Sequence, residues 1–211
     1  MPPQWLPQAV DKENAAETYP ISHHVASGHG PLDADQVLAF WFQECSPSQW
    51  FVKDQAFDQL VRERFIGLTR QAIAGELALW GEDPGQGLAL VVVLDQFPRQ
   101  IWRNSAMAFS GDGPALALSQ KALAQGWIAA EAEQARRQFW LMPQMHAEDL
   151  AIQEAAIPLF QQFTDERTAR FAGRHRDVIA RFGRFPHRNA FLGRRSSGEE
   201  LAFLQTPGSG F

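Results

Sequence analysis

The polar residues between positions 181 and 189 have the types and spacing that could do chemistry. This stretch reads RFGRFPHRN and ends in His187, Arg188 and Asn189. An imidazole can accept or donate a proton, and a guanidinium binds oxyanions through a planar fork. An amide both donates and accepts hydrogen bonds. Because Pro186 disfavours helical backbone at the residue before it, we expect an irregular turn. We expect His187 and Arg188 to face solvent there, inside a groove, and to contact an anionic ligand.

A second polar group follows an apolar run. Asp95 and Arg99 are four residues apart, so a helix would place them on one face as an ion pair, with Arg103 continuing the stripe. Pro98 lies between them and frees a backbone carbonyl near position 94. Two interpretations are open: the pair braces a kinked helix, or Asp95 orients Arg99 toward an anionic group.

A third group contains His146, Glu148 and Asp149. His146, Asp149 and Gln153 recur at helical spacing, which predicts one shared face, whereas Glu148 points elsewhere. Carboxylates also favour the beginning of a helix. Helix capping and acid/base or ligand contact are therefore both open, and the spacing is poor for a closed metal site.

Arginines in these motifs need partners if they are buried, because an unpaired buried cation is costly. The arginines in question are Arg181, Arg184 and Arg188, and the natural partners are Asp95, Glu148 and Asp149. The same residues can thus form a ligand pocket or a buried network that locks helices together.

Other reactive residue types give weaker indications. We expect His175, inside a long polar helix, to lie at the surface, and Cys45 has no identifiable base that would make it a nucleophile. The histidines His23, His24 and His29 could bind a metal adventitiously, but we expect no metal site. The sequence contains no P-loop, dinucleotide fingerprint, G-x-S-x-G or H-E-x-x-H motif, so we expect no cofactor.

The segments that must position these groups are predicted to be helical. Residues 55–74 show helical periodicity, and the Leu/Val run at 88–94 is assigned to a helix because no convincing strand exists to pair with it. Further helices are expected at 112–124, from 131 until Pro143 interrupts it, at 149–163, at 165–182 before Gly183, and after the capping boxes at 196–200. The predicted fold class is all-α, with roughly eight helices packed antiparallel through short connections.

Composition limits the partners. The chain has 211 residues, 45% of them hydrophobic, with a net charge of −5, which argues against a nucleic-acid surface. A single cysteine fits a reducing cytosol, and no apolar run approaches the ~20 residues that span a bilayer. We therefore expect a cytoplasmic protein. We expect residues 1–31 to be a disordered tail, 32–206 one domain and 207–211 a flexible end.

The three motifs together resemble a known family. The stretches LDQFPR at 94–99, MP at 142–143 with HAEDL at 146–150, and RFGRFPHRN at 181–189 with LGR at 192–194 are similar, in order and spacing, to a bacterial family labelled domain of unknown function 924. The resemblance extends from about position 38 to 204. It implies an all-α fold like the tetratricopeptide superhelix, and it implies no established activity.

Three functions are compatible with these residues. The first is a domain whose pocket of His, Arg and Asp side chains binds a small anionic molecule or an acidic peptide end. The candidate binding residues are Asp95, Arg99, His146, Glu148, Asp149, Arg184, His187, Arg188 and Asn189. The second is a small enzyme without a cofactor, with His187 or His146 as general acid/base and Arg99 and Arg188 as the oxyanion clamp. The third is a scaffold whose polar motifs are structural only.

Overall fold

The computed structural model describes residues 33–210, and within them every regular element is helical. The α-helices are α1 (Ala34–Ala39), α2 (Gln55–Ile73), α3 (Pro84–Val91), α4 (Phe97–Ile101), α5 (Asp112–Ala124), α6 (Trp127–Ala130), α7 (Gln134–His146), α8 (Leu150–Phe163), α9 (Glu166–Phe182) and α10 (Gly198–Leu204). Two wider π-helical turns are η1 (Phe40–Glu44) and η3 (Val92–Gln96), and 3₁₀ turns are η2 (Ala78–Glu82), η4 (Ala106–Phe109) and η5 (Pro186–Arg188). The predicted all-α class is confirmed.

Local signals set the helix ends. Asp54 and Asp83 cap α2 and α3 by accepting hydrogen bonds from first-turn N–H groups, which would otherwise lack partners. Ser197 and Glu200 form the predicted capping box of α10. Gly183 ends α9 in the left-handed region at φ 69°, where glycine is favoured.

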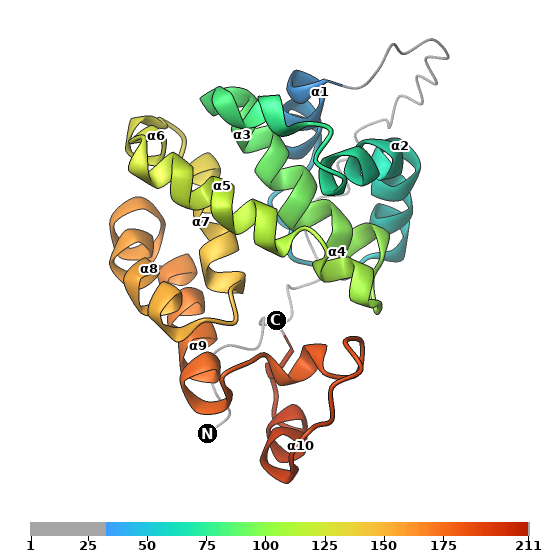
Figure 1. Ribbon diagram of the computed structural model, residues 1–211, viewed down its shortest axis with the longest axis vertical. Coiled ribbons are helices and arrows are strands. Elements are labelled where there is room, and N and C mark those ends of the chain that lie inside the picture. Colours follow the sequence, from blue (N-terminus) through green and yellow to red (C-terminus); the bar gives the residue numbers. More distant parts are fainter. Residues whose placement is uncertain (1–32, 211) are drawn as a thin grey trace, which may run out of the picture. The chain divides into compact units, whose positions relative to one another are not determined.

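The odd-numbered helices form a continuous stack. Helix α1 packs on α3, α3 on α5, α5 on α7 and α7 on α9 (Figure 1). Helix α2 packs on α4, and α8 packs on both α7 and α9. Each helix thus contacts close neighbours along the chain, as in helical superhelices. This arrangement agrees with the tetratricopeptide-like description.

Aromatic side chains fill the core of this stack. Phe40, Trp41, Phe65, Phe97 and Phe139 are at most 1% exposed, and their rings approach one another edge-on or tilted. Such ring pairs stabilise a core beyond their buried area. A smaller apolar cluster around Phe185 lies in the C-terminal part and includes Val178 and Ile179.

The predictions for the Leu/Val run and for the helix with Pro143 had different outcomes. The Val run is helical, because α3 continues into η3, as predicted. Its side chains are buried. The expected interruption at Pro143 was wrong, since α7 continues through this proline to His146. A proline removes one N–H bond, and the packing of α7 against α5 and α8 outweighs that loss.

Within residues 33–210, none of the helices combines the length and apolarity that crossing a membrane requires. The predicted tail at 1–31, including His23, His24 and His29, lies outside the described residues.

Candidate functional site

Residues from distant parts of the sequence form one closed circle of polar contacts. His146 Nδ1 lies 2.8 Å from Asp95 Oδ1, and Arg99 Nη1 lies 3.4 Å from the same oxygen. Arg99 Nη1 also lies 2.9 Å from Asp112 Oδ1, and Arg188 Nη1 donates to the other Asp112 oxygen across 3.0 Å. Arg188 Nη2 donates to the backbone carbonyl of His146 across 3.1 Å, which closes the circle. We term these five residues the central polar network.

The backbone around Asp95 explains how this residue reaches the network. Pro98 has no N–H, so the bond that would normally return to residue 94 is missing. The chain widens into η3, where the N–H of Phe97 donates to the carbonyl of Val92. Such π-turns within helices often occur at functional sites. The wide turn carries Asp95 in the buried centre, at 0% exposure.

Gly111 brings Asp112 to this turn. A Cβ atom at position 111 would lie 2.1 Å from the carbonyl oxygen of Leu94, so only glycine permits the close approach. Helix α5 begins at the next residue, and its first side chain, that of Asp112, therefore lies beside Arg99.

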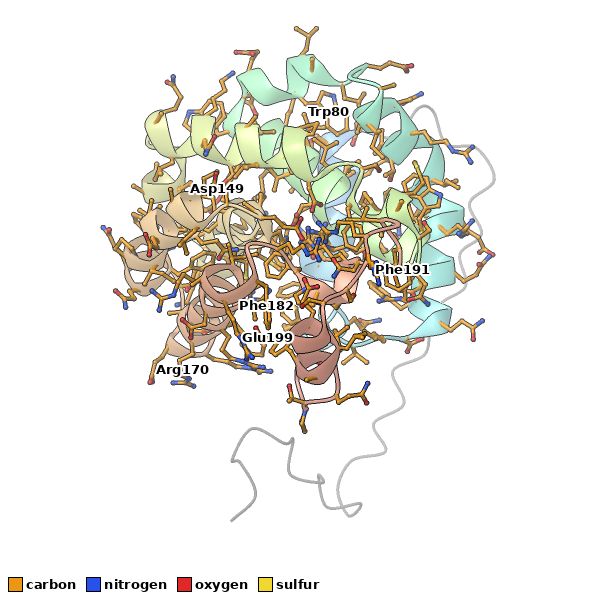
Figure 2. The ribbon with its side chains drawn as sticks, turned by 60° about the horizontal axis from the view of Figure 1, so that its bottom comes forward. Trp80, Asp149, Arg170, Phe182, Phe191 and Glu199 are labelled. Carbon is orange, nitrogen blue, oxygen red and sulfur yellow. The ribbon has the colours of Figure 1, made fainter. Side chains whose placement is uncertain are left out.

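The remaining two members come from segments that end or interrupt helices. His146 is the last residue of α7, because Ala147 is extended at ψ 134°. Arg188 is in η5, which follows the extended Phe185 that Pro186 was predicted to impose. Figure 2 shows nitrogen and oxygen atoms gathered near the middle of the view.

The electrostatics favour a carboxylate beside a neutral imidazole. Burial alone would raise the pKa of Asp95, but the nearby His146 and Arg99, with hydrogen bonds from His146 and Gln96, lower it. Burial lowers the pKa of His146 below its usual value, despite the attraction of Asp95. Near neutral pH, Asp95 is therefore ionised and His146 is neutral.

Burial and neighbouring cations lower the pKa values of both Arg188 and His187. Burial and the neighbouring Arg99 lower the pKa of Arg188 to about 10, so its side chain is still a cation at neutral pH. Burial, Arg188, Lys53 and Arg99 lower the pKa of His187 to about 3, which makes it a very weak base. Of the two histidines predicted as acid/base groups, His146 is the one with a carboxylate partner at hydrogen-bond distance.

Several placements differ from the sequence predictions. Arg188 is 6% exposed, so the expectation that it faces solvent was wrong, and its carboxylate partner is Asp112. His175 is 5% exposed, with its ring 6.1 Å from that of His146, so its predicted surface position was also wrong. Phe185 contacts the His175 ring of α9, and Arg188 donates to the carbonyl of His146 at the end of α7. Long-range packing of this kind is not predictable from local patterns.

His146 and Asp149 do not share one helical face, because the chain is extended between α7 and α8. Asp149 is exposed and caps α8 by accepting from the N–H of Ile152 across 3.1 Å. The Glu148 side chain binds Arg194 through both oxygens, at 2.5 and 2.9 Å, and accepts the Phe185 N–H. Glu148 thus fixes the η5 turn next to the central polar network.

Arg184 and Asn189 belong to the C-terminal segment. Arg184 donates to both oxygens of Glu200, at 2.6 and 2.8 Å. The Asn189 amide donates to Ser196 across 3.1 Å. Neither residue has a hydrogen bond or ion pair to the central polar network among the contacts of the described residues.

Asp112, Arg194 and Glu200 were not predicted as site or network residues. Asp112 was recognised only as a helix start, because an aspartate before Gly-Pro is typical of that role. The nearby Phe109 also escaped notice, although the Arg188 guanidinium lies 4.7 Å from the centre of its ring. Gly111 was the one sequence signal for a close backbone approach.

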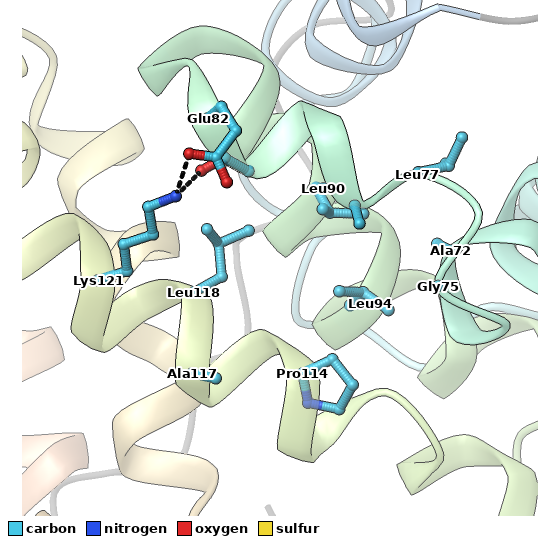
Figure 3. A pocket seen from close by; sticks show the side chains of 12 residues that line it. Ala72, Gly75, Leu77, Glu82, Leu90, Leu94, Pro114, Ala117, Leu118 and Lys121 are labelled. Carbon is cyan, nitrogen blue, oxygen red and sulfur yellow. Dashed lines mark hydrogen bonds and ion pairs between the residues drawn. The ribbon is translucent and has the colours of Figure 1, made fainter.

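An apolar groove lies elsewhere in the described part of the chain. It has a volume of about 350 Å³ and is lined by leucines such as Leu90, Leu94 and Leu118, with the Lys121–Glu82 ion pair at 2.8 Å (Figure 3). None of the predicted site residues lines it. Residues 33–210 also contain no group of His, Cys, Asp and Glu side chains arranged to hold a metal ion.

Burial also bears on the cysteine. Cys45 is buried, and burial raises the pKa of its thiol to about 12. The thiol therefore stays protonated, which agrees with the prediction that Cys45 is not a nucleophile.

Comparison with known proteins gives one family and one solved structure. The family described as "Bacterial protein of unknown function (DUF924)" matches residues 37–208. A solved structure from Agrobacterium tumefaciens, described as the protein of unknown function ATU0120, is 38% identical in sequence. The match covers 82% of this chain and 96% of that one, with a TM-score of 0.76. No curated protein matches the chain.

Proposed function

This chain belongs to the bacterial DUF924 family, and we propose that its all-α domain binds a small anionic molecule at the central polar network. The supporting observation is a pair of guanidinium groups that share one carboxylate and keep unused donors. Arg99 and Arg188 both contact Asp112, and Arg99 Nη2 and Arg188 Nε have no hydrogen-bond partner among the described residues.

Unused buried donors are unfavourable unless a ligand satisfies them. A buried N–H without an acceptor loses its hydration, and the loss is larger when the group is charged. An oxyanion supplies several acceptor oxygens and matches the planar fork of a guanidinium. The carboxylate end of a peptide would offer the same chemistry as a free carboxylate.

The two arginines are also held close together. Their guanidinium carbons lie 4.7 Å (Arg188) and 5.9 Å (Arg99) from the centre of the Phe109 ring. Two cations that share one carboxylate repel each other, and Arg99 contributes to lowering the pKa of Arg188. A bound anion would relieve this repulsion.

The test is thermal unfolding of the full chain with inorganic phosphate or acetate at constant ionic strength. A ligand that binds only the folded state raises the melting temperature. Phosphate or acetate should stabilise the wild-type protein and lose this effect in Arg99→Gln. Arg103→Gln is the matched control, because Arg103 lies just beyond α4 and pairs with Asp58, outside the network.

The outcomes separate binding from a purely structural role. Stabilisation in the wild type and in Arg103→Gln, but not in Arg99→Gln, supports the proposal. Stabilisation by neither anion, or equal stabilisation of Arg99→Gln, contradicts it and favours the scaffold hypothesis, in which the network only joins α4, α5, α7 and η5.

A second candidate function is acid/base catalysis on the bound anion. The observation that favours it is the Asp95–His146 pair, in which a carboxylate orients a neutral imidazole. Its test is to incubate the protein with each anion that stabilises it and to follow the anion by NMR. Conversion that His146→Gln abolishes would support an enzyme, and an unchanged anion would leave binding as the function.

A further inference from the structure

The contacts of Asp95 determine which nitrogen of His146 carries the proton. Asp95 accepts a hydrogen bond from Gln96 and lies beside Arg99, so its carboxylate is surrounded by donors. An ionised carboxylate can only accept. The 2.8 Å contact with His146 therefore requires a proton on His146 Nδ1. In a neutral imidazole this leaves Nε2 with a lone pair and no proton.

This acceptor is available to a small molecule. His146 Nε2 has no hydrogen-bond partner among the described residues, and it is not completely shielded from solvent. The side chain of His146 is 12% exposed. A ligand hydroxyl can therefore donate to Nε2 without displacing an existing hydrogen bond.

The acceptor belongs to the same unit as the two guanidinium groups. His146 and Arg99 contact the same oxygen of Asp95, and Arg188 donates to the backbone carbonyl of His146. A small ligand that contacts both the free donors of Arg99 and Arg188 and the His146 ring would meet a lone pair at Nε2. A fully deprotonated oxyanion would present another lone pair there, which is repulsive.

We propose that this site selects oxyanions that carry a hydrogen-bond donor of their own, such as hydrogen phosphate or a 2-hydroxycarboxylate. The guanidinium groups bind the charged oxygens, and His146 Nε2 accepts the hydrogen of the ligand hydroxyl. Sulfate and simple carboxylates, which lack that hydrogen, are discriminated against. This inference depends on the anion site proposed above.

Calorimetric titration of the full chain with matched anions tests the selection. Phosphate is compared with sulfate, and glycolate with acetate, at constant ionic strength and a slightly alkaline pH. The hydrogen bond to Nε2 should make the protic member of at least one pair bind roughly tenfold more tightly. Which pair responds distinguishes a phosphate site from a hydroxycarboxylate site.

Two histidine variants identify the acceptor. In His146→Phe the members of each pair should bind equally, because no acceptor remains. His175→Phe is the matched control: its ring is also buried, but its Nδ1 bonds to the Phe171 carbonyl and it is outside the network. The control should keep the preference.

Each result has a distinct meaning. Binding of neither pair by the wild type overturns the anion site itself. Equal binding within both pairs leaves the anion site standing and overturns the selection. A preference that persists in His146→Phe shows that another group is the acceptor, which also overturns the inference.

A measurement on the unmodified protein guards against misfolded variants. The tautomer of His146 can be read from the nitrogen shifts and couplings of ¹⁵N-labelled imidazoles. We expect the proton on Nδ1 and an unprotonated Nε2. A proton on Nε2 would overturn the selection even if an anion binds.

Discussion

The Arg184–Glu200 pair and the central polar network both join arginine to carboxylate, but they use the guanidinium donors differently. Arg184 donates twice to Glu200, at 2.6 and 2.8 Å, and once to the carbonyl of Arg195 at 2.9 Å. One carboxylate serves one guanidinium. In the network, Asp112 serves both Arg99 and Arg188.

The difference indicates two roles for one residue type. Arg184 and Glu200 are 16 residues apart, and their pair closes a local turn before α10. Arg188 and Asp112 are 76 residues apart, and their contact joins the η5 turn to the first residue of α5. Within the described residues, the local pair has no buried donor without an acceptor, whereas the long-range network keeps buried donors of Arg99 and Arg188 that a ligand could use.

The largest expected effect is that of Arg188→Ala. Arg188 is 6% exposed, packs against the rings of Phe109 and Phe185 and donates to Asp112 and to the His146 carbonyl. Its removal leaves a cavity and a buried carbonyl without its donor, although Asp112 keeps Arg99, and should lower the free energy of unfolding by about 3–5 kcal/mol. Urea unfolding of this variant, of Asp112→Ala and of the double variant measures the coupling. Additive effects would show that the two side chains do not depend on each other.

Gly111→Ala should have the next largest effect. The added Cβ would lie 2.1 Å from the Leu94 carbonyl oxygen, so backbone must shift at a cost of about 1–3 kcal/mol. Gly113→Ala, in the first turn of the same helix, is the control, because a Cβ there meets no atom within 4 Å. Equal urea midpoints for the two variants would refute the close approach that brings Asp112 to the network.

His187 should make stability fall in mild acid. Its folded-state pKa is lowered from 6.5 to about 3, so between these values the unfolded chain binds more protons. Stability is then lost as the pH falls, by up to about 1.4 kcal/mol per pH unit. His187→Gln should flatten this slope in urea melts across that range. An unchanged slope would place the proton uptake elsewhere.

The Arg184–Glu200 pair should respond to stronger acid only. The hydrogen bond from Arg184 outweighs burial and lowers the pKa of Glu200 from 4.5 to about 2. Its stabilisation is complete above pH 4.5 and is lost as the pH falls toward 2. The loss of stability is smaller than that expected from His187, because solvent screens Arg184, whose side chain is 32% exposed. Glu200→Gln should weaken the pH dependence in this lower window and leave that of His187 intact.

Asp149 should show the smallest effect. Asp149→Ala removes the cap of α8 and should cost about 1 kcal/mol, whereas Asp149→Asn keeps a cap and should cost a few tenths. Neither variant should alter phosphate binding, because Asp149 is outside the network. Loss of binding in Asp149→Asn would return this residue to the candidate site.

Prediction from the sequence succeeded where the signal is local. Helix ends depend on residues within a few positions, so Asp83, Ser197 and Gly183 could be assigned to their roles before any fold was known. The pairing of Asp95 with Arg99 also follows from helical spacing. The cytoplasmic location and the flexible ends stay predictions.

Partners of the buried groups could not be predicted in the same way. Position at a helix start does not reveal that Asp112, the first residue of α5, binds two arginines, whereas Asp149 only caps α8. The burial of His175 likewise depends on a later segment, because Phe185, just before η5, packs against the His175 ring.

The sequence by itself determined the helices, their caps and the three polar motifs, because these depend on neighbours within one or two turns. Only the tertiary structure decided that Arg188 is buried against Asp112 and that His146 presents a neutral imidazole with Nε2 free. Those properties depend on desolvation and on charges from distant segments, which exist only after α5, α7 and η5 have packed together.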